Sequence, residues 1–90
     1  MIARIEVADP GAAHQLVFRL AEEIDGATVA FDVERGQVEL DVQKDPERAL
    51  LAALGVVEEW LAAHGLGPTM VELDDQIYVL EPAVGVGGGG

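Results

Sequence analysis

The sequence predicts an α+β domain whose strands and helices follow one another in the order β-α-β-β-α-β. Two observations carry this prediction. The dipeptide Asp-Pro stands twice between a strand pattern and an apolar helical pattern, at Asp9-Pro10 and at Asp45-Pro46. Between the two helical patterns lie two strand patterns, separated by Arg35-Gly36. Two strand–helix units arranged in this way indicate a repeat within one small sheet-and-helix domain.

The first strand and the first helix are predicted from the opening 26 residues. Apolar and polar side chains alternate over residues 1–7, which is the pattern of a half-buried strand. Asp9 can then cap a helix with its side chain, and the ring of Pro10 suits the first helical position. The apolar spacing predicts that this helix runs to about Ile24, and Gly26 leads into the next strand.

A β-hairpin is predicted next. Residues 28–34 and 37–43 both alternate between apolar and polar side chains, and Val33 is expected to share the apolar face of the first of these strands. Gly36 lies between them and supplies the positive φ that a tight turn requires. The two strands are therefore expected to pair in antiparallel fashion.

The second helix is predicted to start at Pro46 and to run to about His64. Gly65 suits a left-handed cap at its end, and Leu66 is placed for the hydrophobic contact of a Schellman motif. Residues 69–73 then form a strand pattern.

The last part of the chain leaves two alternatives open. Asp74-Asp75-Gln76 is a candidate turn, and residues 77–80 are either a fifth strand or a bent continuation of the fourth. We expect a single domain over residues 1–82, followed by a flexible Gly-rich tail over residues 83–90. The order of elements is that of the ferredoxin-like fold, an antiparallel sheet that carries two helices on one face and leaves the other face open.

Charge excludes several classes of partner. The chain carries 17 acidic and 5 basic residues, a net charge of −12. Nucleic acid binding needs Lys and Arg to displace counterions, so we expect no nucleic acid partner, and anionic membranes are disfavoured for the same reason. No apolar run approaches the ~20 residues of a membrane span, and the N-terminus lacks the features of a signal peptide. We expect a cytoplasmic protein.

The open face of the predicted sheet is expected to be acidic. Apart from Arg4, it lacks the aromatic and basic residues with which RNA-binding domains of this topology stack bases and meet phosphates. A divalent cation favours carboxylate oxygens, but no spacing such as D-x-D-x-D-G occurs, so no metal ligands are assigned. The residues expected on this face are Arg4, Glu6, Asp32, Glu34, Glu39, Asp41 and Glu72.

The sequence offers no specific catalytic group, and an enzyme that uses one of the 17 carboxylates for acid–base chemistry is a distant third alternative. The chain contains no Ser and no Cys, and its two Thr residues, Thr28 and Thr69, lie in strand patterns. Nucleophilic catalysis needs an activated hydroxyl, thiol or similar group, and no phosphate-binding loop is present. We therefore predict a protein that is not an enzyme, with no catalytic residues and no cofactor.

Apolar residues beyond the needs of a simple core predict a protein partner. The second helix carries a second apolar stripe that includes Val56, Trp60 and Ala63. Trp60 either wraps the edge of the core or anchors a contact with another chain, since Trp is enriched at such anchors. On the first helix, Phe18 lies one turn after His14 and away from the main stripe. These five residues predict an interaction module that self-associates or serves as an adaptor or subunit.

The segment Val7-Ala8-Asp9-Pro10-Gly11 is similar to the start of ACT-type regulatory domains. In that family an Asp and a Pro-Gly lie between the first strand and the first helix, where small ligands such as amino acids bind at a dimer interface. In this chain Asp9 and Pro10 are adjacent, without the usual intervening residue. The resemblance implies a small-molecule-sensing domain with Asp9, Pro10 and Gly11 as its ligand loop. A plain helix start accounts for Asp9-Pro10 equally well.

Overall fold

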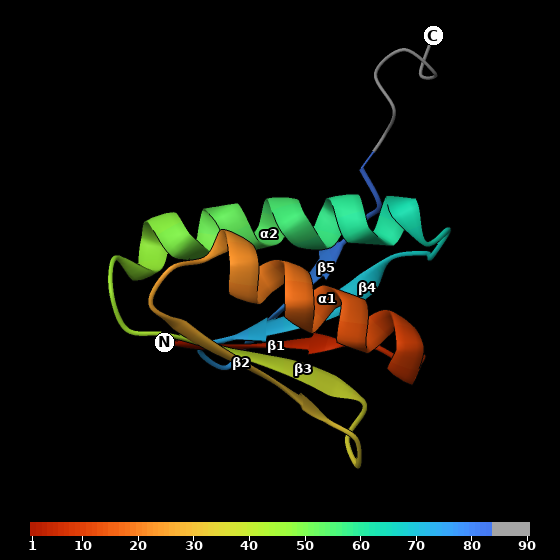
Figure 1. Ribbon diagram of the computed structural model, residues 1–90, viewed down its shortest axis with the longest axis horizontal. Coiled ribbons are helices and arrows are strands. Elements are labelled where there is room, and N and C mark those ends of the chain that lie inside the picture. The colour runs from red at the N-terminus through yellow and green to blue at the C-terminus, as the bar shows by residue number, and fades with distance from the viewer. Residues whose placement is uncertain (84–90) are drawn as a thin grey trace, which may run out of the picture.

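A five-stranded antiparallel sheet carries two helices on one face in the computed structural model, which describes residues 1–83 (Figure 1). The strand order is β2-β3-β1-β4-β5, with every neighbouring pair antiparallel. This confirms the predicted ferredoxin-like fold and its extra C-terminal strand. The elements are β1 (Ile2–Glu6), α1 (Pro10–Glu23), β2 (Ala27–Asp32), β3 (Gln37–Val42), α2 (Pro46–Ala63), β4 (Thr69–Leu73) and β5 (Gln76–Leu80). Residues 84–90, which hold most of the predicted Gly-rich tail, lie outside the described residues.

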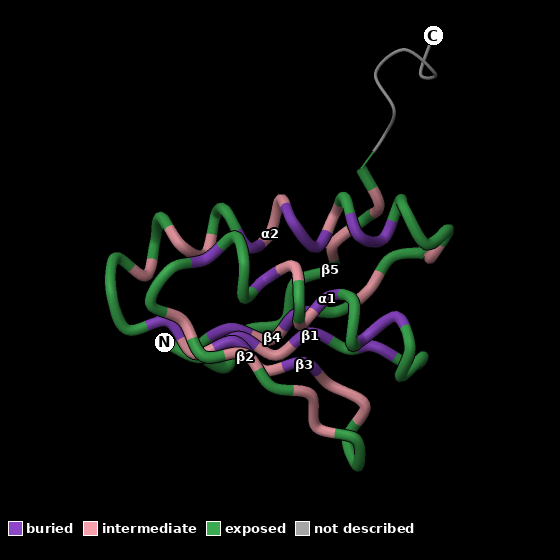
Figure 2. Tube along the Cα trace, in the orientation of Figure 1, coloured by how far each residue is buried: buried purple, intermediate pink, exposed green. Residues whose placement is uncertain are grey.

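The core lies between the sheet and the helices, and strand alternation determines which side chains enter it. Figure 2 shows buried residues on the sides of the helices and strands that face one another. Ile5 on β1 and Leu40 on β3 are buried, whereas their neighbours along each strand point to the open face. Burying a side chain of this size contributes about 1.5–3 kcal/mol. The largest fully buried side chains are Trp60, Ile5, Leu16, Leu20, Leu40 and Leu61.

The two helices begin differently although both begin at Asp-Pro. Asp9 is extended, with a φ of −96°, and its carboxylate accepts a hydrogen bond of 3.0 Å from the backbone N–H of Gly11. Asp45 has a left-handed backbone, with a φ of 48°, and its side chain makes no capping hydrogen bond. Asp9 therefore satisfies a free N–H of its helix, and Asp45 does not.

The end of α2 confirms the predicted Schellman motif. Gly65 has a φ of 64°, which a residue with a side chain rarely adopts. The N–H of Leu66 donates to the carbonyl of Leu61 at 2.9 Å, and the N–H of Gly65 donates to that of Ala62 at 3.3 Å. These are the two hydrogen bonds that define the motif.

Two short turns shape the hairpins. In the β2–β3 turn, the Asp32 carboxylate accepts hydrogen bonds from the N–H groups of Glu34 and Arg35 at 3.1 and 3.2 Å. The strand therefore ends at Asp32, and Val33, predicted on the apolar face, is 74% exposed in the turn. In the β4–β5 turn, Asp74 and Asp75 both have positive φ, which is the signature of a type I′ turn.

Neither helix in the described part of the chain combines the length and the apolar character needed to cross a membrane.

Candidate functional site

Two of the predicted partner residues lie in the core. Trp60 is 1% exposed, and its indole N–H donates to the carbonyl of Ala12 on α1 at 2.8 Å. Val56 is buried beside it in the same core. The prediction that these two residues face a partner is corrected by the position of α2, which packs against both the sheet and α1. A helix with two packing neighbours needs two apolar stripes, so the second stripe serves α1.

The remaining predicted partner residues are exposed but do not come from one element. Phe18 on α1 is 64% exposed. His14, one turn earlier, contacts the ring of Phe31 on β2 edge to face, with ring centroids 5.8 Å apart. Ala63 is the last residue of α2. His14 and Phe18 thus share α1, whereas Ala63 belongs to the other helix.

The predicted ligand loop borders a groove. Residues 6–9 form one wall and residues 66–70 the other, and the groove has a volume of about 340 Å³. The hydroxyl of Thr69 donates to the carbonyl of Glu6 and joins the two walls. Of the three predicted loop residues, only Asp9 lines the groove, and its carboxylate caps α1. Pro10 and Gly11 belong to the first turn of α1.

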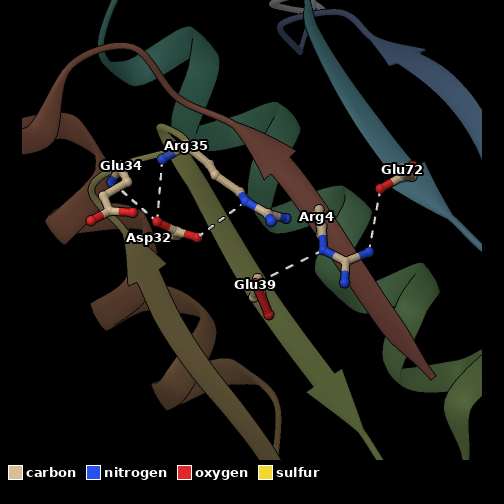
Figure 3. A network of polar contacts seen from close by, with 6 residues as sticks. All are labelled: Arg4, Asp32, Glu34, Arg35, Glu39 and Glu72. Carbon is tan, nitrogen blue, oxygen red and sulfur yellow. Dashed lines mark hydrogen bonds and ion pairs between the residues drawn. The ribbon is translucent and has the colours of Figure 1, made fainter.

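The open face of the sheet is organised around Arg4, as Figure 3 shows. Arg4 on β1 lies opposite Glu39 on β3 and Glu72 on β4, in the pairing register of the sheet. Its guanidinium lies 3.3 Å from the carboxylate of Glu72 and 3.9 Å from that of Glu39. One cation therefore serves two carboxylates at the centre of the face. Glu34, predicted on this face, lies in the β2–β3 turn instead.

In residues 1–83, no group of three or more His, Asp or Glu side chains is arranged to hold a metal ion. The carboxylates of the open face are spread along the strands, and those nearest Arg4 pair with it.

An exposed apolar cluster at the end of the sheet was missed by sequence reasoning. Ile77 and Val79 on β5 are each 65% exposed, and Val79 lies opposite Met70 of β4 on the open face. Tyr78 points to the other side of the sheet and is 47% exposed. We call Met70, Ile77, Tyr78 and Val79 the β5 edge patch. The signal was the uncharged run from Ile77 to Leu80, whose β-branched and aromatic residues Ile77, Tyr78 and Val79 are typical of a strand.

The β5 edge patch is enclosed by acidic residues. Asp74 and Asp75 precede the strand, and Glu81 follows it, while Glu72 lies opposite Ile77. From residue 69 to residue 83 the sequence contains these four carboxylates and no Lys or Arg. The patch is thus an apolar strip with negative charge at both ends.

Comparison with protein-family models, with curated proteins and with solved structures finds no match for this chain.

Proposed function

We propose that this chain is a non-enzymatic protein-interaction module, an adaptor or subunit, whose partner docks on the β5 edge patch. The observation that carries the proposal is the pair Ile77 and Val79, each 65% exposed on a strand whose only partner in the described part of the chain is β4. An edge strand exposes unpaired N–H and C=O groups, and proteins usually protect such edges with charge, proline or a covering element. Between Gln76 and Leu80, β5 carries no charge and no proline, and α2 contacts it only from the helix side of the sheet, opposite to Ile77 and Val79.

The energetics favour covering this strand. Full burial of an Ile or Val side chain is worth about 1.5–3 kcal/mol. Ile77 and Val79 are each 65% exposed, so covering both contributes roughly 2–4 kcal/mol toward the about 8 kcal/mol of a micromolar interaction. The other edge of the sheet, β2, is different because α1 packs against it and its Phe31 contacts His14. An apolar cluster that the fold leaves uncovered is typical of a site for another protein.

Affinity capture tests the proposal. The tagged chain, the double variant Ile77→Ser/Val79→Ser and the control Val33→Ser/Leu51→Ser are used as bait in a lysate of the source cells. Val33 and Leu51 are also highly exposed apolar residues, but they lie on the β2–β3 turn and on α2. We expect proteins that wild type and control retain alike, and that the β5 variant retains at least tenfold less. Captured sets that do not differ between the two variants would overturn the proposal.

The groove beside Asp9 favours a second candidate function, a small-molecule-sensing regulatory domain. Its volume of about 340 Å³ is at the lower end of the range for ligand sites, and its walls are the two loops that flank β1 and β4. A thermal-shift screen of amino acids and nucleotides tests this function. A ligand at 100 times its Kd stabilises its protein by about 2.7 kcal/mol, so no shift at millimolar concentrations would count against it.

A further inference from the structure

The β5 edge has backbone groups available for another strand. β5 pairs with β4 from Thr69↔Leu80 to Leu73↔Gln76 and has no other strand neighbour within residues 1–83. In an antiparallel ladder, alternate residues direct their N–H and C=O groups to opposite sides, so part of β5 points away from β4. After the strand the chain turns to α2, where the N–H of Ala83 donates to the carbonyl of Glu58 at 3.0 Å.

The charges around this edge are all of one sign. Gln76 to Leu80 is an uncharged strand, with Asp74 and Asp75 before it and Glu81 after it. Arg4, the basic residue on the adjoining open face, is already shared by Glu39 and Glu72. An occupant with Lys or Arg at both ends and apolar residues between them would match this pattern along its whole length.

A second copy of the chain does not match the acidic residues at the two ends of β5. Antiparallel pairing of β5 with itself about Tyr78 would put Asp75 opposite Glu81 of the other copy, once at each end of the interface. Like charges directly opposite one another destabilise paired strands. Each copy also has a net charge of −12, which adds repulsion over a longer range.

We infer that β5 receives an extended segment of a different protein, which adds a sixth strand to the sheet, alternates apolar residues over about five positions and carries Lys or Arg at both ends. Backbone hydrogen bonds to β5 hold the segment. Ile77 and Val79 contact its apolar side chains on the open face, and Asp74, Asp75 and Glu81 select its basic ends. This inference rests on the proposed function and specifies the chemistry of the partner.

The test is a selection of displayed random 12-residue peptides on the full chain. Peptides that also bind Ile77→Ser/Val79→Ser are removed, and amide hydrogen exchange then locates each remaining peptide on the chain. We expect enriched peptides with alternating apolar residues between basic ends, and slower exchange at residues 76–80. Three outcomes would each overturn the inference. The enriched peptides could be neutral or acidic, they could slow amide exchange outside residues 76–80, or no peptide could bind with a Kd below 1 mM.

A charge variant tests the role of the carboxylates. In Asp74→Asn/Asp75→Asn/Glu81→Gln the strand is unchanged, and Asn tolerates the positive φ of the turn. Loss of three exposed pairs is expected to weaken binding of the selected peptide roughly tenfold at low salt. The control Glu22→Gln/Glu23→Gln/Asp25→Asn removes the same charge at the end of α1 and should bind as wild type. Equal weakening in both variants would show that only net charge matters and would overturn the inference.

Light scattering of the wild-type chain tests whether a second copy of the chain, and not another protein, covers β5. Dimers that form in the selection buffer and slow amide exchange at residues 76–80 would mean that a second copy covers β5, contrary to this inference. The capture experiment is independent of that outcome. If captured proteins depend on Ile77 and Val79 but bind through a segment without basic ends, the proposed function stands and only the inferred chemistry fails.

Discussion

Asp9-Pro10 and Asp45-Pro46 occupy equivalent places in the two halves of the molecule, yet they differ in backbone conformation and in whether the Asp side chain caps the helix. Asp9 is extended and caps α1 through its carboxylate, whereas Asp45 is left-handed and offers α2 no side-chain cap. The start of α1 is thus stabilised locally. α2 relies instead on packing, through its two apolar stripes and the contact of Trp60 with α1. The same dipeptide begins a helix in both halves, but the source of stability differs.

The largest expected effect is in the second half, at Trp60. Trp60→Ala removes a fully buried side chain from the contact between the helices, and large-to-small changes of this kind cost about 3–5 kcal/mol. That is a large part of the roughly 5–15 kcal/mol by which a domain is stable. Urea unfolding followed by circular dichroism measures the change. A loss below about 1 kcal/mol would show that α2 does not depend on this packing.

Trp60→Phe separates the hydrogen bond from the volume. The variant keeps an aromatic ring but removes the indole donor, while the carbonyl of Ala12 keeps its hydrogen bond within α1, so the expected loss is about 0.5–1.5 kcal/mol. Unfolding under the same conditions should place it between wild type and Trp60→Ala. A loss equal to that of Trp60→Ala would mean that ring volume contributes nothing here.

Removal of the cap tests the first half. Asp9→Ala deletes the acceptor for the N–H of Gly11, and loss of such a cap costs about 0.5–2 kcal/mol. Asp45→Asn is the comparison in the second half, where no capping bond is lost and Asn tolerates the left-handed backbone. The difference in unfolding free energy between the two variants is the measurement. Equal losses at both positions would contradict the distinction between the two helix starts.

Glycine at the same two positions should act in opposite directions. Asp45→Gly relieves the cost of a left-handed backbone, which is about 1–2 kcal/mol for a residue with a side chain, and part of that gain is offset by the entropy of glycine in the unfolded chain. A net gain of about 0.5 kcal/mol is expected. Asp9→Gly should instead lose a few tenths of a kcal/mol. Thermal unfolding of both variants gives the signs, and a destabilised Asp45→Gly would refute the expectation.

The smallest effect is expected at Phe18. This side chain is 64% exposed on α1, so Phe18→Ser should change stability by no more than about 0.5 kcal/mol. Phe18 and Trp60 were expected to share one partner surface. The two variants test whether one residue is exposed and the other buried in solution. A loss at Phe18 near that of Trp60→Ala would mean that Phe18 is covered in solution.

Much of the fold could be predicted because it follows from local chemistry. Alternation along β1 and β3, the positive φ of Gly36 and the Gly65 cap each depend on neighbouring residues, and these are found where the sequence places them. The left-handed backbone of Asp45 could not be predicted from its neighbours. Asp9 is also followed by Pro, yet its φ is −96° whereas that of Asp45 is 48°. Val33 lies outside the strand because the Asp32 carboxylate accepts hydrogen bonds from two N–H groups of the turn, and β2 ends at Asp32, two residues before the predicted end at residue 34.

The candidate site was harder to predict because exposure is a tertiary property. Trp60 has the composition of an interface anchor, and only the position of α1 shows that it is buried. Conversely, Ile77 and Val79 have the composition of a core strand. They are exposed because β5 is the last strand of the sheet and both helices lie on the opposite face, so no helix or strand of residues 1–83 covers them. The sequence pattern identified apolar residues correctly but did not determine which of them face solvent.

Trp60 also gives the molecule a built-in optical reporter. It is the single Trp of the chain and is buried between α1 and α2, where its indole N–H donates to the carbonyl of Ala12. The centroid of the His64 ring lies 5.9 Å from that of the Trp60 ring. Its fluorescence therefore reports whether the two helices are docked. β5 lies in a different layer of the molecule (Figure 1). A ligand at the sheet edge should leave this emission unchanged, whereas separation of the helices should shift it to longer wavelength.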